Sequence, residues 1–307
     1  MGYSMAYVLC HAPGVLNLTF ALAGNAQTTT VFEAKFGWNE QETVLYNTII
    51  SSSAIVGLAI GSFVAGPLIK TGRRKGAIIA NLMGIVSSAI AMAGTTPFLT
   101  AGRLLLGIAA GIYNVIFGKM IIENMPEHLC HKLCMFHNVT VCCGFVLAFG
   151  MGGLLPDAKD LEANKADEYW RVIYLVPAFI GVFIVLIVAL VFKQEPIAYC
   201  IVMGHEEQGK QHMHRVYSKT DPNSSETIEE ILESQYNFMR RSTTMDATST
   251  TFIQAICGRK YRRASWTCFI LSCFYQQTGV NAVILYANRL LVRMEAEGTG
   301  SFPLTPT

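Results

Sequence analysis

The chain has 307 residues, of which 52% are hydrophobic and only 14% are charged, and its formal net charge is +2. Soluble domains carry roughly one quarter charged residues, so this composition excludes an ordinary soluble protein. The small net charge, without a basic stripe interleaved with aromatic residues, also excludes a nucleic-acid-binding protein.

Seven apolar stretches follow one another along the chain. Each has the length that an α-helix needs to cross the hydrocarbon core of a bilayer, roughly 20 residues. We therefore predict an all-α polytopic membrane helix bundle whose surroundings are the lipid bilayer. The predicted spans are 7–30, 46–69, 76–95, 98–122, 132–153, 171–192 and 264–290.

Basic residues are concentrated in two of the connecting segments. The link 70–75 contains four lysines and arginines, and the segment 196–263 contains nine. The loops 31–45 and 154–170 are acidic instead. Because cytoplasmic loops carry the excess of Lys and Arg, we predict a cytoplasmic N-terminus, an exoplasmic first loop and a cytoplasmic 196–263 segment.

The chain is predicted to divide into three parts. Residues 1–195 are expected to form an N-terminal six-helix transmembrane bundle, and residues 196–263 a cytoplasmic helical linker. Residues 264–307 are expected to form a seventh span with a short exoplasmic tail.

Two features of the linker predict short surface helices. Asn223 with Glu226 forms an N-cap pairing before an amphipathic run, and a second amphipathic run covers 252–256. A solvated linker is the alternative. The pair His212 and His214 is expected on a solvated helix and not as a metal site.

Small residues recur at every fourth position in two spans. Gly57, Gly61 and Ala65 do so in the second span, and Gly107 and Gly111 in the fourth. This spacing puts small residues on one helix face, where they allow two backbones to approach closely. We therefore predict tight helix packing along these stripes.

Four charged residues lie at the predicted cytoplasmic ends of the spans. Arg73 and Arg74 follow the second span, Glu123 ends the fourth and Glu195 follows the sixth. Charges at a membrane boundary are much less costly when they pair. We predict that the two carboxylates face the arginine pair.

The last predicted span contains amides inside an apolar run, in "YQQTGVNAVILY" at 275–286. A polar group left without a partner in hydrocarbon costs several kcal/mol. Gln276 and Asn281 are five residues apart, or about 140° around a helix, so they share a broad face. Amides both donate and accept, which suits the hydroxyl groups of a sugar. Hydrogen bonding between helices is the alternative role.

Several motifs together resemble the sugar-porter (hexose transporter) branch of the major facilitator superfamily, over its N-terminal half and seventh span. The resemblance rests on the basic turn after the second span, the fourth-span pattern, the end of the sixth span and the amide motif of the seventh. The matching residues are Gly72, Arg73, Arg74, Gly102, Arg103, Gly107, Glu123, Pro126, His137, Gly144, Glu195, Tyr199, Gln276, Gly279 and Asn281. The departures are Ile69, Gly118, Met120 and Ala198, where the family has polar, proline or aromatic residues.

The resemblance implies two functional sites. Asn138, Tyr275, Gln276 and Asn281 take the positions at which the family binds its sugar. Arg73, Arg74, Glu123 and Glu195 take the positions of a cytoplasmic gate, whose ion pairs would form when that side is closed and bias the protein outward-facing.

The resemblance also implies a function, namely the transport of a hexose-type sugar by alternating access. The first span, from Tyr7 to Thr30, contains no Asp or Glu. Proton-driven members of the family usually carry a carboxylate there, so we expect facilitated diffusion. No enzyme motif of the HExxH, GxSxG or P-loop type is present, and no cofactor is expected.

The number of spans leaves alternatives open. The family has twelve spans in two halves, whereas seven are predicted here. The sequence is then a truncated half-transporter, or a second chain supplies the missing C-terminal half, or the protein is a transport-inactive relic serving as an accessory subunit of a larger membrane complex. The plasma membrane is expected as its location, with an organelle as the alternative.

Overall fold

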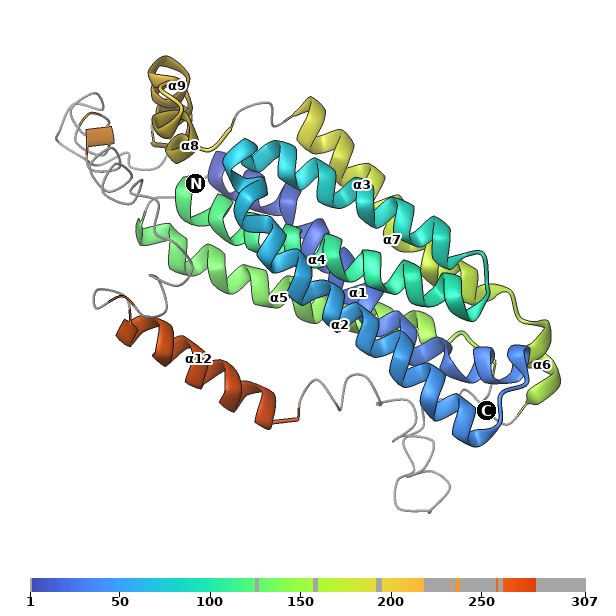
Figure 1. Ribbon diagram of the computed structural model, residues 1–307. Coiled ribbons are helices and arrows are strands. Elements are labelled where there is room, and N and C mark those ends of the chain that lie inside the picture. The colour runs from blue at the N-terminus through green and yellow to red at the C-terminus, as the bar shows by residue number, and fades with distance from the viewer. Residues whose placement is uncertain are drawn as a thin grey trace.

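The computed structural model describes residues 2–124, 127–156, 160–191, 195–217, 233, 236–237, 258 and 262–279, and their regular structure is helical (Figure 1). Six long helices form one bundle. They are α1 (Gly2–Phe36), α2 (Glu40–Thr71), α3 (Arg73–Ala91), α4 (Thr96–Asn124), α5 (Glu127–Gly152) and α7 (Tyr169–Leu190). The shorter helices are α6 (Leu161–Ala166), α8 (Ile197–Val202), α9 (Glu206–Tyr217) and α12 (Arg262–Gln277).

The predicted helical bundle is confirmed. Each of the first six predicted spans coincides with one long helix, although α1 extends beyond its predicted span at both ends. Among the described residues, four helical segments are long and apolar enough to cross a bilayer, namely Gln41–Thr71, Thr96–Glu123, Cys134–Gly152 and Tyr169–Leu190. The protein is an integral multi-pass membrane protein.

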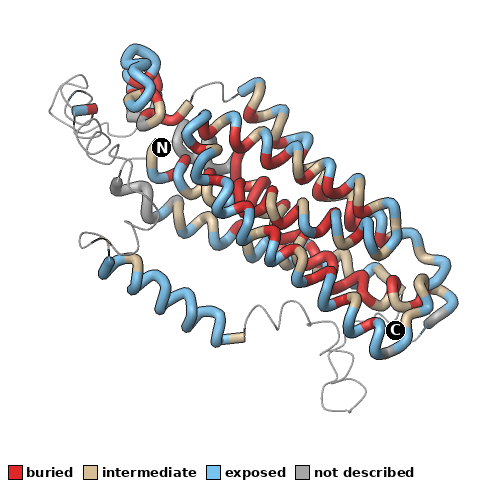
Figure 2. The backbone as a smooth tube through the Cα atoms, in the orientation of Figure 1, coloured by how far each residue is buried: buried red, intermediate tan, exposed pale blue. Residues whose placement is uncertain are grey.

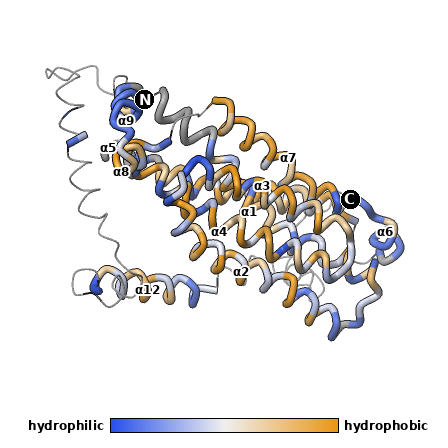
Figure 3. The backbone as a smooth tube through the Cα atoms, turned by 45° about the horizontal axis from the view of Figure 1, so that its top comes forward, coloured by the Kyte–Doolittle hydropathy of each residue, from blue (hydrophilic) through white to orange (hydrophobic). Residues whose placement is uncertain are grey.

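Hydrophobic residues run along the long helices of the bundle (Figure 3), and many large ones are exposed. Phe63 on α2, Val146 on α5 and Phe179 on α7 are each about two thirds exposed. A soluble monomer rarely exposes large continuous apolar patches. These side chains are therefore placed where lipid would surround them.

The helix α1 occupies the interior of the bundle (Figure 2). It packs mainly against α5 and α7, while α4 packs against α2 and α3. Its polar side chains Asn17, Asn25 and Gln27 are buried together with Phe20. A helix that is enclosed by other helices can hold polar side chains, because its neighbours supply hydrogen-bond partners.

The predicted small-residue stripes face each other across α2 and α4. A Cβ atom added at Gly57 would overlap the carbonyl oxygen of Leu104, and one added at Gly107 would overlap that of Ala54. The same holds for Gly61 against Ile108. The two backbones are therefore in direct contact, which confirms the close approach predicted from the stripe.

Two features of the predicted linker can be compared with the structure. The helices α8 and α9 lie within it, while the helices predicted near 223–232 and 252–256 lie outside the described residues. His212 was expected on a solvated helix, and that prediction is wrong for this residue because its side chain is only 1% exposed. Gly209, His212 and Met213 form the buried face of α9, whereas His214 is exposed.

Candidate functional site

The charged cluster begins at the turn between α2 and α3. Gly72 has a φ of +132°, in the region that favours glycine, and a Cβ atom there would lie 2.9 Å from Oε1 of Glu195. This turn starts α3 directly at Arg73, so both arginines belong to the first turn of the helix. The absence of a side chain at Gly72 lets the Glu195 carboxylate approach.

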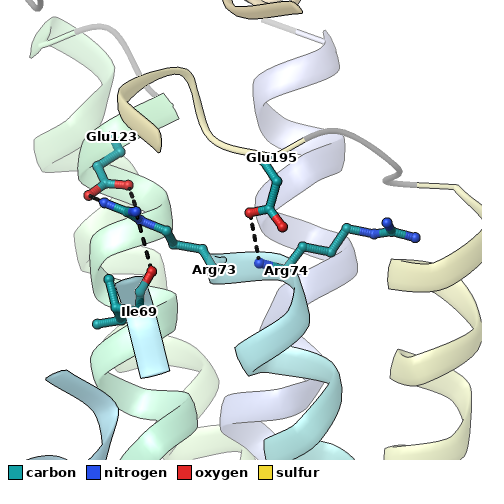
Figure 4. Close-up of polar contacts among 5 residues, drawn as sticks. All are labelled: Ile69, Arg73, Arg74, Glu123 and Glu195. Carbon is teal, nitrogen blue, oxygen red and sulfur yellow. Dashed lines mark hydrogen bonds and ion pairs between the residues drawn. The ribbon is translucent and has the colours of Figure 1, made fainter. Parts of the chain in front are cut away.

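Arg73 and Glu123 form a two-point ion pair (Figure 4). Nε of Arg73 donates to Oε2 of Glu123 at 2.9 Å, and Nη2 donates to Oε1 at 2.9 Å. The two side chains are only 10% and 14% exposed. Such a bidentate bond fixes the guanidinium in orientation as well as position, and it links the start of α3 to the end of α4.

Arg74 extends in the opposite direction (Figure 4). Its Nε and Nη2 donate to the carbonyl oxygens of Val188 and Ala189 at 3.1 and 3.0 Å, near the end of α7. The last carbonyl groups of a helix have no partner within the helix and carry partial negative charge. Arg74 therefore supplies donors to the end of α7.

The sequence predicted that the two carboxylates face the arginine pair, but among the described residues Glu195 forms no ion pair with Arg74. Its Oε2 accepts the backbone N–H of Arg74 at 3.1 Å, while the guanidinium is occupied by α7. The physical reason is that the first N–H groups of a helix are also without helical partners, and a carboxylate satisfies one of them well. Of the four residues predicted to form gate ion pairs, Arg73 and Glu123 are the two that form one within the described residues.

Helix α8 covers this cluster. The ring of Tyr199 lies 5.2 Å from the Arg73 guanidinium, and its hydroxyl donates to the carbonyl oxygen of Thr71 at 3.3 Å. A ring nitrogen of His212, Nδ1, lies 2.9 Å from the carbonyl oxygen of Glu195. Burial, with the nearby Glu195 charge, raises the pKa of the Cys200 thiol. The contact of His212 was missed in the sequence, although the spacing of Gly209, His212 and Met213 could have revealed it.

The predicted sugar-binding residues lie on two helices. Asn138 is exposed on α5, a helix of the bundle. Tyr275 is 57% exposed on α12, and Gln276 next to it is also exposed. No residue of α12 is buried, and the helix lies outside the packed bundle (Figure 1). Asn281 lies outside the described residues, so the described structure does not gather the four into one closed site.

A buried polar network connects α1, α2 and α7, and the sequence did not predict it. Nδ2 of Asn25 donates to Oγ of Ser51 at 3.1 Å, and the Tyr174 hydroxyl donates to Oδ1 of Asn25 at 3.1 Å. Thr29 donates to Oδ1 of Asn47 at 3.3 Å. The amides of α1 thus bind neighbouring helices. The signal available was the set of polar residues in an otherwise apolar span.

The opposite end of the bundle carries a second charged contact. Nζ of Lys35 at the end of α1 lies 2.5 Å from Oε1 of Glu168, and Nε of Arg171 lies 2.6 Å from Oε2. Both cations also lie over the ring of buried Trp170. The hydrogen bond from Lys35 lowers the pKa of the Glu168 carboxyl, with smaller contributions from the charges of Lys35 and Arg171, against an opposing effect of desolvation.

Comparison with known proteins gives a consistent result. The model of a family described as "Sugar (and other) transporter" matches residues 6–299. Hexose transporter 1 of Plasmodium vivax (strain Brazil I) is 24% identical over 94% of this chain and 58% of its own length. Glucose transporter 2C of Trypanosoma brucei brucei is 35% identical, over 41% of this chain and 39% of its own length.

Solved structures show the same fold. The proton:xylose symporter XylE bound to 6-bromo-6-deoxy-D-glucose matches with a TM-score of 0.75 at 17% identity, covering 94% of this chain and 62% of that one. The inward-open form of XylE from E. coli gives a TM-score of 0.71. The chain thus spans 58% of the Plasmodium relative and 62% of this XylE chain.

The helical bundle, with its charged turn between α2 and α3, defines a transporter fold of the major facilitator type, as the sequence motifs indicated. Since the family model covers nearly the whole chain, the identification can be made more specific. The chain belongs to the sugar (and other) transporter family.

Proposed function

We propose that the protein is a hexose transporter that works by facilitated diffusion through alternating access. The observation that carries this proposal is the match of residues 6–299 to the sugar transporter family. Relatives named Hexose transporter 1 and a structural neighbour bound to a glucose derivative support a hexose-type substrate.

Sugar binding is assigned in this proposal to Asn138, Tyr275, Gln276 and Asn281. The exposure of Asn138 and Tyr275 supports this assignment, because side chains that only join helices would be buried between them. Neutral amides pair with sugar hydroxyls through both donors and acceptors. Transporters of this architecture bind their substrates near the middle of the membrane, between their halves.

The charged cluster is assigned the role of a gate on the cytoplasmic side. The bidentate bond between Arg73 and Glu123 supports this role, since a strong and directional contact can favour one of two conformations. In this proposal residues 1–195 form one half of the transporter, 196–263 a cytoplasmic linker and 264–307 the seventh span. The N-terminus is cytoplasmic, the membrane is the plasma membrane, and further spans or a second chain complete the sugar cleft.

Uptake of labelled glucose into proteoliposomes tests the proposal. We expect saturable uptake that falls at least tenfold when Gln276 or Asn281 is replaced by alanine. Each substitution removes the hydrogen bonds of one neutral amide to the sugar, and a loss of about 1.4 kcal/mol in binding free energy corresponds to a factor of ten. Gln277→Ala is the matched control, because this neighbouring amide lies outside the motif positions. Uptake that is equal in all these variants would reject the binding assignment.

A role as a transport-inactive accessory subunit is the second candidate. Ile69 and Met120, two of the positions that depart from the family pattern, are buried in the apolar core and thus contribute packing. On this alternative the protein binds no sugar and co-purifies with a stable membrane assembly. Isolation of the protein as a monomer that binds glucose would exclude it.

A further inference from the structure

A small cavity lies inside the bundle, between α1, α3, α4 and α7. Its volume is about 20 Å³, and its lining includes Gly24, Ser87, Ser88, Arg103 and Tyr174. A cavity of this size holds about one water molecule or one ion of similar radius. Its described lining comes from α1, α3, α4 and α7, and Asn138, Tyr275 and Gln276 are not part of it.

Among the described residues of this lining, Arg103 is the only charged one, and it is 1% exposed. Nη2 donates to the carbonyl oxygen of Leu22 at 3.1 Å, and Nη1 donates to the carbonyl oxygen of Ala21. Nε has no hydrogen-bond partner within the described structure. An arginine guanidinium keeps its proton in proteins. A full positive charge is therefore buried here, and its Nε–H donor is unused in the described structure.

Among the described residues of the lining helices, no carboxylate lies close enough to neutralise Arg103. Helices α3 and α7 contain no Asp or Glu in their whole length, and the first on α1 is Glu33. Glu33 is 11 residues beyond Leu22, or about 17 Å along the helix axis. Glu123, the acidic residue of α4, already binds Arg73. None of the described ion pairs includes Arg103.

We propose that this cavity binds a small monovalent anion, of the size of chloride, as the counterion of Arg103. Two carbonyl dipoles compensate the charge only in part, and a buried charge without a counter-charge is costly. A water molecule would satisfy Nε but would leave the charge unbalanced. The cavity has room for a halide, whereas sulfate and gluconate are larger anions. This inference does not depend on sugar transport.

Thermal unfolding of the protein in lipid nanodiscs tests the proposal. At constant ionic strength, sodium gluconate is replaced stepwise by sodium chloride or sodium bromide. A ligand that binds the folded state raises the unfolding midpoint in a saturable way. We expect the midpoint to rise by several degrees with either halide and to stay unchanged with sulfate. Equal midpoints in all salts would mean that water fills the cavity, and would overturn the proposal.

A pair of variants makes the test specific. Ser88→Asp places a carboxylate beside Arg103, so the halide dependence should disappear and the midpoint in gluconate should reach at least the wild-type value in chloride. Ser88→Asn fills the same space without the charge, so it should also lose the halide dependence, but its midpoint should stay below the wild-type value in chloride because the charge of Arg103 remains unbalanced. Arg171→Gln, at a half-exposed side chain, should keep the halide dependence. A halide response that persists in Ser88→Asp, or is lost in Arg171→Gln, would contradict the proposal.

Discussion

At the scale of single residues, the two carboxylates of the charged cluster, Glu123 and Glu195, make different kinds of contact. Glu123 binds a buried guanidinium at two points, whereas Glu195 accepts a backbone N–H at the start of α3. The first contact balances a charge, while the second satisfies a helix end. The two therefore respond differently to neutralisation.

We predict that Glu123→Gln destabilises the protein by about 2 kcal/mol, below the 3–5 kcal/mol for a fully buried pair because both side chains keep some exposure. Arg73→Lys should destabilise the protein by a smaller amount, since an ammonium group keeps the charge but cannot reproduce the two-point bond. Unfolding midpoints in nanodiscs measure both. Glu195→Gln is the matched control and should cost less, because an amide oxygen can still accept the Arg74 N–H.

A double-mutant cycle separates pairing from other effects. If Arg73 and Glu123 interact as described, the loss in the double variant Arg73→Gln with Glu123→Gln should be smaller than the sum of the two single losses. Additive losses would show that the pair contributes no coupling.

The sequence could identify which residues carry charge at this end but not how they pair. Glu123 was expected near either arginine, and both arginines carry the same charge. The choice depends on the Gly72 turn, which directs Arg73 toward α4 and Arg74 toward α7. Such a turn geometry is not encoded in spacing or charge alone, and neither is the burial of His212.

At the scale of elements, the contact of α2 with α4 depends on glycines whose missing side chains leave room for the opposite backbone. The stripe was visible in the sequence because four-residue spacing is a property of one helix. The partner was not visible, because nothing in the spacing says that Gly57 meets Leu104 or that Gly107 meets Ala54. Helix α6 was missed for a related reason, since six residues capped by Asp160 are too short for a periodic signal.

We predict that Gly107→Ala destabilises the protein by about 3 kcal/mol, because the added methyl group forces the α2 and α4 backbones apart. Gly118→Ala is the control on the same helix. Apart from its own helix backbone, no atom of the described residues would lie within 4 Å of its added Cβ, and alanine favours a helix over glycine by up to about 1 kcal/mol. Gly118→Ala should therefore be neutral or stabilising. Equal unfolding midpoints for the two variants would contradict the described contact.

At the scale of the whole molecule, the fold was predictable to a large extent and the substrate site was not. Each of the first six apolar stretches predicted from the sequence corresponds to one long helix, since a segment that crosses the bilayer must satisfy its backbone hydrogen bonds internally. The proposed sugar site depends on how α12 stands relative to Asn138, which is a long-range arrangement. Tyr275 and Gln276 are on a helix without buried residues, so local sequence signals could name these residues but not assemble them.

Energy coupling is a property of the whole protein, and we predict that sugar uptake is independent of a proton gradient. Helix α1 has no Asp or Glu before Glu33, and its buried polar residues other than His11 are amides and hydroxyls, which carry no exchangeable charge near neutral pH. Proteoliposomes should take up glucose at the same rate with and without an inward proton gradient. Acceleration by the gradient, abolished by a protonophore, would show symport instead.

The hydrogen bond from Nδ2 of Asn17 to the carbonyl oxygen of Pro177 is 3.0 Å long and joins positions 160 residues apart. During synthesis α1 is made long before α7, so the Asn17 amide lacks this hydrogen-bond partner until α7 has been made. Helix α1 therefore completes this contact only after α7 has been made. The native packing of α1 therefore depends on a helix that is synthesised much later.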